Sequence, residues 1–429
     1  MSEKRGMSTV IAAVGIIVAL IIGILGGYFL APSKTATPTQ SQLSGVLKIG
    51  AALPLTGDLA TYGENAQIAL TMAKNEINAL LANSNAGYSY DIIFQDTQTK
   101  PELALTATQD LASKGCQVIL GYYSSGELRN CMTYAQSNQL VLVSPSSTAT
   151  SLAEPGVNRA FIYRFVPADD KQGPAMARGM IDNGISYIVP IWRGDTYGDG
   201  LVKATEDRFK ALGGDYTTNQ IRYNIDAKEF SSEVGVLAQE VQKAVDAKGK
   251  DKVGVYAVTF EEITSIMTSA TQYPILSQVK WFGCDGQALS AKITSDPVVA
   301  NFTTTVKFPA TYFAPPQNDI LTKVSNYVNS QVGHVPDPYA YGSYDSFYVV
   351  AKCVAFTQQY TGAAINKIFP TVSYSTYGAS GWCALNEYGD RTIGDYEFWQ
   401  VYQAPSGYTW YKAGLYTAGT DSVQWYPQP

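Results

Sequence analysis

The amino-acid sequence predicts an α/β protein in which two doubly wound, parallel-sheet lobes follow a single N-terminal transmembrane helix. Three observations support this fold class. The chain of 429 residues is too long for one compact core, and short apolar runs alternate along it with segments of helical spacing. A long uncharged run precedes this alternation.

The N-terminal run extends without a charged residue from Met7 to Leu30. As a helix it spans about 36 Å, which exceeds the roughly 30 Å of a bilayer's hydrocarbon core. Lys4 and Arg5 precede it, so the bias toward positive cytoplasmic flanks places the folded body outside the cytoplasm. We therefore expect residues 1–30 to form a signal or anchor helix in a single-pass protein of the cell membrane.

The start of the chain, from Lys4 to Val10, resembles the class III, pilin-like signal peptides of archaeal surface proteins. The resemblance implies cleavage after Gly6 and retention of the apolar helix. Cleavage elsewhere, as in a secretory signal, and the absence of cleavage both stay open. Residues 31–44 contain mostly Ser, Thr, Pro and Gln, which indicates a flexible linker, so the folded body is expected to begin near Gly45.

The first globular unit begins with the apolar run 46–53, which ends at Pro54 and has the length of a buried parallel strand. In the next segment, 64–81, apolar residues recur at intervals of three and four positions and thus share one face of a helix. The same alternation continues with strands at 90–95, 117–121 and 140–144 and helices at 101–114 and 126–138.

A second unit repeats the pattern. Its helices are expected at 172–183, 198–212, 231–247 and 261–271, and its strands at 186–192, 220–223, 252–258 and 278–282. The connections are short, so right-handed crossovers build parallel sheets that helices cover on both faces. Because open sheets of this kind bind ligands at the carboxyl ends of their strands, the cleft between the two units is the expected ligand site.

Composition excludes several classes of function. The formal net charge of −6 offers no basic surface to a nucleic-acid backbone. The single histidine, His334, has no nucleophile motif nearby and the chain has no phosphate-binding glycine motif, so neither an enzyme nor a cofactor is expected. The five cysteines form no Cys-x-x-Cys pair, which argues against a zinc site; whether some of them form disulfides stays open.

A set of short motifs follows in a fixed order along both units, beginning with the segment 50–63, which runs into 73–78. The later motifs are Gly121-Tyr122-Tyr123-Ser124-Ser125, Ser144-Pro145-Ser146-Ser147-Thr148, Gln172-Gly173-Pro174, Tyr197-Gly198-Asp199-Gly200 and Gly389-Asp390-Arg391. In this order they resemble the branched-chain amino-acid-binding proteins, which are the solute receptors of ABC importers and have the type I periplasmic-binding fold. The resemblance covers about residues 45–402.

The resemblance also implies that the chain crosses between the lobes three times, so that each lobe is discontinuous. Lobe 1 is then expected to contain residues 45–166 and 310–392, and lobe 2 residues 167–309 and 393–429. Segments around Pro167 and Pro309 fall at the crossings and can act as hinges.

Polar residues follow several strands of the predicted sheets. Ser125 opens a helix, where a hydroxyl and free backbone N–H groups suit a carboxylate; the resemblance implies this role, and a plain helix N-cap is the alternative. Ser146 and Thr148 follow the next strand, with plain turn chemistry as the alternative. Asp285 follows the strand 278–282, and the resemblance implies that an acidic residue there binds the ligand's ammonium group. Many relatives have the longer Glu, so the shorter side chain leaves the exact ligand open, and a solvated loop aspartate next to Gly286 is the alternative.

Aromatic residues complete the expected site. Tyr62 and Tyr197 belong to matched loops of opposite lobes and are expected to close over the ligand. Trp192, Phe260 and Tyr339 are candidates for lining its side-chain pocket, with ordinary packing as the alternative.

Together these expectations describe a surface-anchored receptor that binds a small, aliphatic amino acid in its cleft and delivers it to ABC permease subunits. An amide, urea or aromatic-acid receptor, or a sensory ligand domain, would have the same fold. A pilin-like structural surface protein is a further alternative that the N-terminus alone suggests. The expected partners are a small-molecule ligand, the permease and, through the N-terminal helix, the membrane; no metal, cofactor or nucleic acid is expected.

Overall fold

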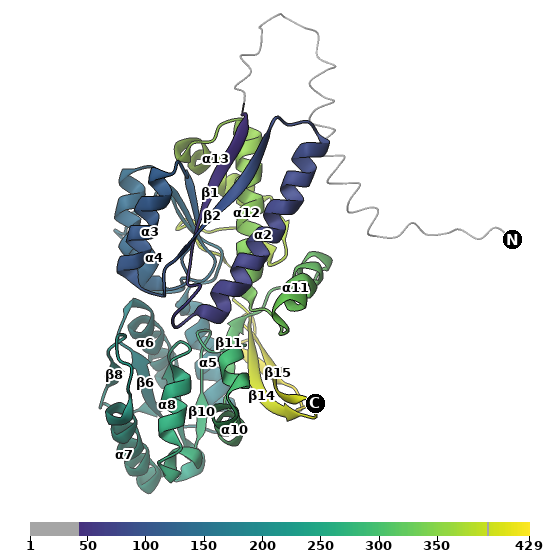
Figure 1. The fold of residues 1–429 in the computed structure, drawn as a ribbon. Helices are drawn as coiled ribbons and strands as arrows, with labels where there is room; N and C mark the ends of the chain where they lie inside the picture. Colours follow the sequence, from purple (N-terminus) through teal and green to yellow (C-terminus); the bar gives the residue numbers. More distant parts are fainter. Residues whose placement is uncertain (1–42, 393) are drawn as a thin grey trace, which may run out of the picture. The chain divides into compact units, whose positions relative to one another are not determined.

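Two parallel sheets and one antiparallel sheet dominate this computed structural model, which describes residues 43–392 and 394–429 (Figure 1). The described chain belongs to one compact unit. The predicted anchor at 1–30 and most of the linker at 31–44 lie outside the described residues. Within the described ranges, no helix is both long and apolar enough to span a membrane.

The first parallel sheet has the strand order β2-β1-β3-β4-β5. Its strands are β1 (Gly45–Leu53), β2 (Tyr88–Asp96), β3 (Val118–Gly121), β4 (Val141–Ser144) and β5 (Ile162–Arg164). The helices that accompany it are α2 (Ala60–Asn83), α3 (Pro101–Ser113), α4 (Ser125–Ser137), α12 (Pro338–Thr357) and α13 (Gly362–Tyr374). Every residue of β3 and β4 is buried, as expected for parallel strands with helices on both faces.

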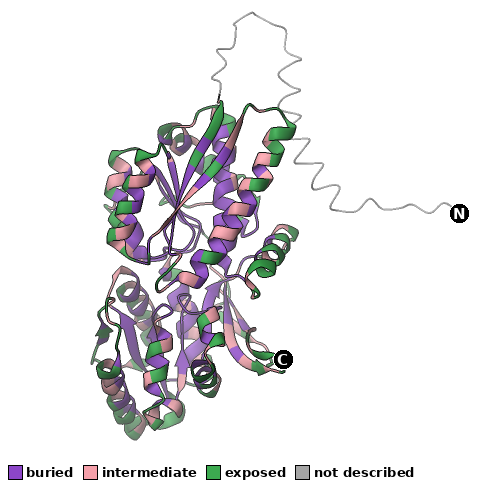
Figure 2. Ribbon diagram, in the orientation of Figure 1, coloured by how far each residue is buried: buried purple, intermediate pink, exposed green. Residues whose placement is uncertain are grey.

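The second parallel sheet has the order β10-β9-β6-β7, with β8 paired to β6. Its strands are β6 (Tyr187–Arg193), β7 (Asp215–Tyr216), β8 (Ile221–Tyr223), β9 (Val253–Val258) and β10 (Lys280–Phe282). The helices of this segment are α5 (Asp169–Asp182), α6 (Thr196–Ala211), α7 (Ser231–Lys248), α8 (Ile263–Ala270), α9 (Ala291–Ser295) and α10 (Pro297–Thr305). Figure 2 shows the central strands of both parallel sheets largely buried, while the outer faces of the helices are exposed.

A third sheet, which the sequence did not predict, is antiparallel in the order β11-β14-β15-β16. Its strands are β11 (Ala310–Phe313), β14 (Tyr396–Ala404), β15 (Gly407–Thr417) and β16 (Ser422–Trp425). The expectation of parallel sheets alone was therefore incomplete: the turn between β14 and β15 is so short that only antiparallel pairing is possible. Strand β11 pairs with β14, although the division into lobes by resemblance places these two strands in different lobes. That division stays a prediction.

The helices and strands expected in the two parallel units are present, with ends that differ by a few residues. Helix α5 begins at Asp169 rather than at residue 172, since acidic side chains in the first turn favour a helix N-terminus. The helix expected at 261–271 begins at Ile263. The sequence analysis assigned no helix or strand after residue 282 and did not assign the short strands β5 and β7. The unassigned elements therefore include helices α9, α10, α12 and α13, helix α11 (Asp319–Val332), and the short strands β12 (Tyr377–Gly378) and β13 (Gly381–Trp382).

One residue noted in the sequence, Asp390, has a structural role. Asp390, from the last motif of the series, accepts hydrogen bonds from Arg164 Nε and Arg159 Nη2, each at 2.7 Å. These charge-assisted bonds connect the segment around Asp390 to β5.

Each of the five cysteines is buried and free, so the described residues contain no disulfide.

Candidate functional site

A small enclosed cavity lies where polar loops at the carboxyl ends of β3, β4 and β10 meet aromatic side chains. Its volume is about 10 Å³, close to the minimum that one water molecule needs. The lining residues are Leu59, Tyr62, Tyr123, Ser125, Ser146, Tyr197, Phe260, Asp285, Gly286 and Tyr339. An amino acid is far larger than this space, so a ligand can enter only if the surrounding side chains move apart.

Asp285 is the acidic residue of the cavity, and only 4% of it is exposed. One carboxylate oxygen, Oδ1, accepts hydrogen bonds from the Tyr197 hydroxyl and, at 2.9 Å, from Gln172 Nε2. The other, Oδ2, accepts a hydrogen bond from the Tyr339 hydroxyl. Burial raises the pKa of Asp285, while these hydrogen bonds favour the ionised carboxylate. No Lys or Arg among the described residues forms an ion pair with it.

A second carboxyl group, Asp169, lies beside Asp285 and is fully buried. It is the first residue of α5, and neither of its oxygens has a hydrogen-bond partner of good geometry among the described residues. Burial raises the pKa of Asp169 well above its ordinary value, and the nearby Asp285 carboxylate raises it further. Thr148 Oγ1 and Gln172 Oε1 are also buried and unpartnered. This group of acceptors has more capacity for N–H donors than the protein supplies.

Ser124 and Ser125 lie at the start of α4, and Ser125 lines the cavity. Ser124 caps the helix: its hydroxyl accepts a hydrogen bond from the Glu127 N–H at 3.3 Å, and the Ser124 N–H donates to Glu127 Oε2 at 2.8 Å. Ser125 Oγ accepts a hydrogen bond from the Ala149 N–H at 3.0 Å. The first N–H groups of a helix have no partner within it and favour negative charge. The Ser125 end of the cavity is therefore suited to an anionic oxygen.

Ser146 and Tyr123 form the wall next to these serines. Ser146 Oγ donates a hydrogen bond to the Tyr123 carbonyl oxygen at 2.8 Å. The lone pairs of Ser146 Oγ can therefore accept a hydrogen bond from a ligand. The Tyr123 hydroxyl is 3.0 Å from Ser343 Oγ. Tyr62 and Tyr339 contribute further aromatic surface, so the cavity is lined by rings with a few polar groups between them.

Beside the cavity, the first turn of α2 and the loop before it are bonded to residues 261–292; we call these contacts the latch. The Thr61 hydroxyl donates to Glu261 Oε1, and Lys292 Nζ lies 2.8 Å from Glu261 Oε2. Backbone groups take part as well, because the Glu261 N–H donates to the Asp58 carbonyl at 3.0 Å. The Tyr62 hydroxyl donates to the Ala288 carbonyl at 3.0 Å. The latch joins a segment expected in lobe 1 to one expected in lobe 2.

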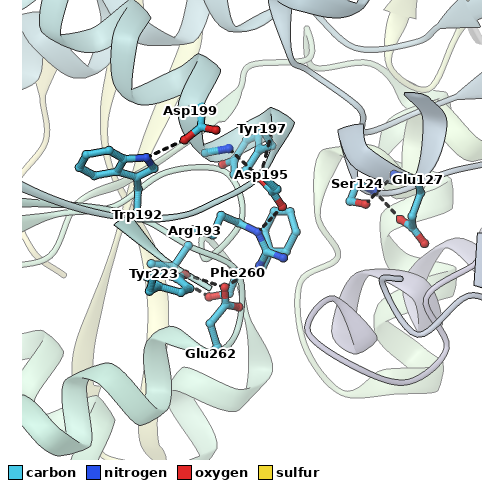
Figure 3. A network of polar contacts seen from close by, with 12 residues as sticks. Ser124, Glu127, Trp192, Arg193, Asp195, Tyr197, Asp199, Tyr223, Phe260 and Glu262 are labelled. Atoms are coloured by element: carbon cyan, nitrogen blue, oxygen red, sulfur yellow. Dashed lines mark hydrogen bonds and ion pairs between the residues drawn. The ribbon is translucent and has the colours of Figure 1, made fainter. Parts of the chain in front are cut away.

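Most of the residues proposed from the sequence meet at this cavity, namely Tyr62, Ser125, Ser146, Tyr197, Phe260, Asp285 and Tyr339. Thr148 is buried beside Asp169 and does not line the cavity. Trp192 is 5% exposed and donates a hydrogen bond from Nε1 to Asp199 Oδ1 at 2.9 Å, away from the cavity (Figure 3). Contact of any of these residues with a ligand stays a prediction.

Sequence reasoning missed three residues of the site. Asp169 was hidden because the helix was expected to begin at residue 172, which left the acidic pair 169–170 in a loop. Gln172 was noticed only as part of a motif, although its amide bonds to Asp285. Tyr123 follows strand β3 in a run of tyrosine and serine, and the position of that run after a strand's carboxyl end was the available signal.

Comparison with known proteins places this fold and site in context. The family described as the receptor family ligand binding region matches residues 65–403. An uncharacterized protein of Methanocaldococcus jannaschii is 30% identical over 421 residues, which cover 94% of this chain and 98% of that protein.

Two solved structures are similar in fold. A leucine binding protein from Thermotoga maritima has a TM-score of 0.69 and 19% identity, with 87% of this chain and 99% of that chain covered. A solute binding protein of an ABC transporter from R. palustris, in complex with benzoate, has a TM-score of 0.66 and 17% identity, with 86% and 96% covered. At these identities the similarity concerns the fold.

Proposed function

Since this chain belongs to the family of receptor ligand-binding regions and has the type I periplasmic-binding fold of non-enzymatic solute-binding proteins, we propose that it is the extracytoplasmic receptor of an ABC-type importer. In this proposal a small amino acid with an aliphatic side chain binds between the two lobes, and the receptor delivers it to a membrane permease. The N-terminal apolar run anchors the receptor to the cell membrane.

The observation that carries the proposal is the pair of buried carboxyl groups, Asp285 and Asp169. No lysine or arginine of the described chain forms an ion pair with either of them, and the Asp169 oxygens, with the Thr148 hydroxyl nearby, have no hydrogen bond of good geometry. Buried charge is unfavourable unless it is paired and hydrogen-bonded. A ligand with an ammonium group supplies both the positive charge and N–H donors.

The opposite end of the cavity supports the carboxylate of the same ligand. Ser125 and the first N–H groups of α4 present hydrogen-bond donors and the positive end of a helix dipole. The cavity thus has hydrogen-bond donors for a carboxylate at one end and carboxyl groups for an ammonium group at the other. These two ends match the two charges of an α-amino acid. The aromatic rings between them offer apolar surface to its side chain.

An aromatic acid fits this site less well, although a structural relative was solved with benzoate. Such a ligand adds a negative charge to a cavity that already contains a buried carboxylate and offers no cation in return. A neutral amide or urea is the stronger alternative. Its N–H groups could satisfy the unpartnered oxygens of Asp169, Gln172 and Thr148 without a charge.

A thermal-shift screen tests the proposal. Residues 42–429, which form one compact unit, would be heated with amino acids, amides, urea and aromatic acids in turn. A ligand at a hundred times its Kd stabilises the native state by about 2.7 kcal/mol, which raises the melting temperature measurably. We expect the largest shift with an aliphatic amino acid. A shift with aromatic acids and none with amino acids would contradict the proposal.

A further inference from the structure

A buried arginine, Arg193, lies directly behind the wall of the cavity without lining it. It is the last residue of β6 and is 2% exposed. Its Nε donates to Asp195 Oδ2 at 2.7 Å and its Nη1 to Glu262 Oε1 at 2.5 Å. The Tyr223 hydroxyl donates to the same Glu262 oxygen at 2.7 Å, so this oxygen accepts hydrogen bonds from two side chains (Figure 3).

The guanidinium of Arg193 also lies over the ring of Phe260, with Cζ 3.6 Å from the ring centroid. Phe260 in turn stacks on Tyr197, with ring centroids 5.1 Å apart and an interplanar angle of 27°. The Tyr197 hydroxyl donates to Asp285. A continuous series of contacts therefore runs from a fixed cation, through two rings, to the carboxylate of the cavity.

A second route leads from Arg193 to the same tyrosine through the backbone. Asp195 uses one oxygen for Arg193 and the other, Oδ1, to accept hydrogen bonds from the N–H groups of Tyr197 (3.1 Å) and Gly198 (2.9 Å). These bonds cap α6 and fix the position of its first turn. Arg193 thus supports Tyr197 at its ring and at its backbone.

The consequence concerns selectivity rather than contact with a ligand. A hydroxyl that donates to Asp285 stabilises its ionised form, which a ligand's ammonium group needs as a partner. If the Tyr197 ring shifts, this bond is lost and the buried carboxyl group favours its protonated form. An amino acid then binds little more tightly than an analogue that has a hydrogen atom in place of the ammonium group.

We propose that Arg193 is a positioning residue that holds the Tyr197 hydroxyl on Asp285 and so sets the preference of the site for ligands with an ammonium group. The inference rests on the proposed function, because it concerns the same cavity. It requires no contact between Arg193 and the ligand. It predicts instead that the effect of Arg193 passes entirely through Tyr197.

A double-mutant cycle tests this route. Kd would be measured by calorimetry for two probe pairs, L-leucine with 4-methylpentanoate and L-alanine with propanoate. The ratio of the two Kd values in a pair is the ammonium selectivity. We expect Arg193→Gln and Tyr197→Phe each to lower this selectivity about tenfold, and the double variant to lower it no further than Tyr197→Phe alone.

Arg222→Gln is the matched control. Arg222 pairs with Asp199 on the same first turn of α6, with Nε 2.8 Å from Oδ1, but both side chains are 47% exposed and neither lines the cavity. We expect the ammonium selectivity of the Arg222→Gln variant to equal that of the unmodified chain. If Arg193→Gln does not fold because it leaves Glu262 unpaired, the double substitution Arg193→Gln with Glu262→Gln removes both charges and replaces it in the cycle.

The outcomes separate the inference from the proposed function. The positioning role would be overturned if the losses of selectivity add in the double variant. It would also be overturned if substitution of Arg193 changes stability to urea but leaves the ammonium selectivity unchanged. If the unmodified chain binds neither amino acid, the proposed function fails and the inference fails with it.

Discussion

Replacement of Asp285 by asparagine should weaken binding of an aliphatic amino acid by at least about a hundredfold. Asp285 is 4% exposed, so its attraction to an ammonium group is little screened by water. Removal of one partner from a buried ion pair typically costs about 3–5 kcal/mol. Even the lower value exceeds two factors of ten, since each 1.4 kcal/mol corresponds to one.

The same substitution should narrow the difference in affinity between the amino acid and its deaminated analogue. In the unmodified chain the analogue leaves the Asp285 carboxylate without a positive partner, and the variant has no such charge. The assay is calorimetric titration of the variant and the unmodified chain with L-leucine and 4-methylpentanoate. Asn keeps the shape of the side chain and an acceptor for Tyr197, so the fold should persist. Unmodified stability to urea would confirm that the loss concerns the ligand.

Asp337→Asn serves as the control. Asp337 is also fully buried, but it caps α12, where its Oδ1 accepts the Tyr339 N–H at 3.0 Å, and it does not line the cavity. Asn caps helices about as well as Asp, so affinity should change little. Equal losses of affinity in the two variants, or unchanged affinity in Asp285→Asn, would refute the reasoning.

Three further predictions concern stability, the latch and the membrane. Burial raises the pKa of Asp337 to about 7, so the stability it contributes is complete below about pH 4 and is lost as pH rises toward 7. Urea denaturation should show a fall of up to about 4 kcal/mol over this range that Asp337→Asn removes; an identical fall in the variant would assign it to other groups. Thr61→Val deletes the hydroxyl bonded to Glu261 and should increase the radius of gyration of the ligand-free chain in X-ray scattering, whereas Thr71→Val, which loses only a bond to Gln67 within α2, should not. An equal radius in all three proteins would exclude Thr61 from the latch. The full chain should fractionate with membranes and resist extraction by salt, and recovery of soluble protein that begins near residue 31 would contradict an anchor.

The sequence predicted the parallel units well because their strands are short apolar runs and their helices carry an apolar stripe. The antiparallel sheet was not predicted because β14 and β15 are only partly buried and contain several tyrosines, so they show no continuous apolar run. Its position also depends on a pairing between β11 and β14, which lie far apart in the chain. Such long-range pairing leaves no local pattern.

The site was predictable where a polar residue follows the carboxyl end of a strand, as with Ser125 and Asp285, because the carboxyl ends of parallel strands converge. It was less predictable where orientation decides the outcome. Thr148 and Ser146 follow the same strand, yet only Ser146 lines the cavity. Asp169 was missed because an acidic residue at a helix start is ordinary, and only its burial without a hydrogen bond of good geometry marks it as unusual.

The most direct test of the account is a crystal structure of the receptor with the amino acid that gives the largest shift in the thermal screen. The account predicts the ligand between the lobes, with its ammonium group within hydrogen-bond distance of Asp285 and Asp169 and its carboxylate at Ser125 and the start of α4. The cavity should be enlarged from its present volume of about 10 Å³ by movement of the surrounding tyrosines. A ligand bound outside this cavity, or one whose ammonium group touches neither carboxyl group, would contradict the central claim.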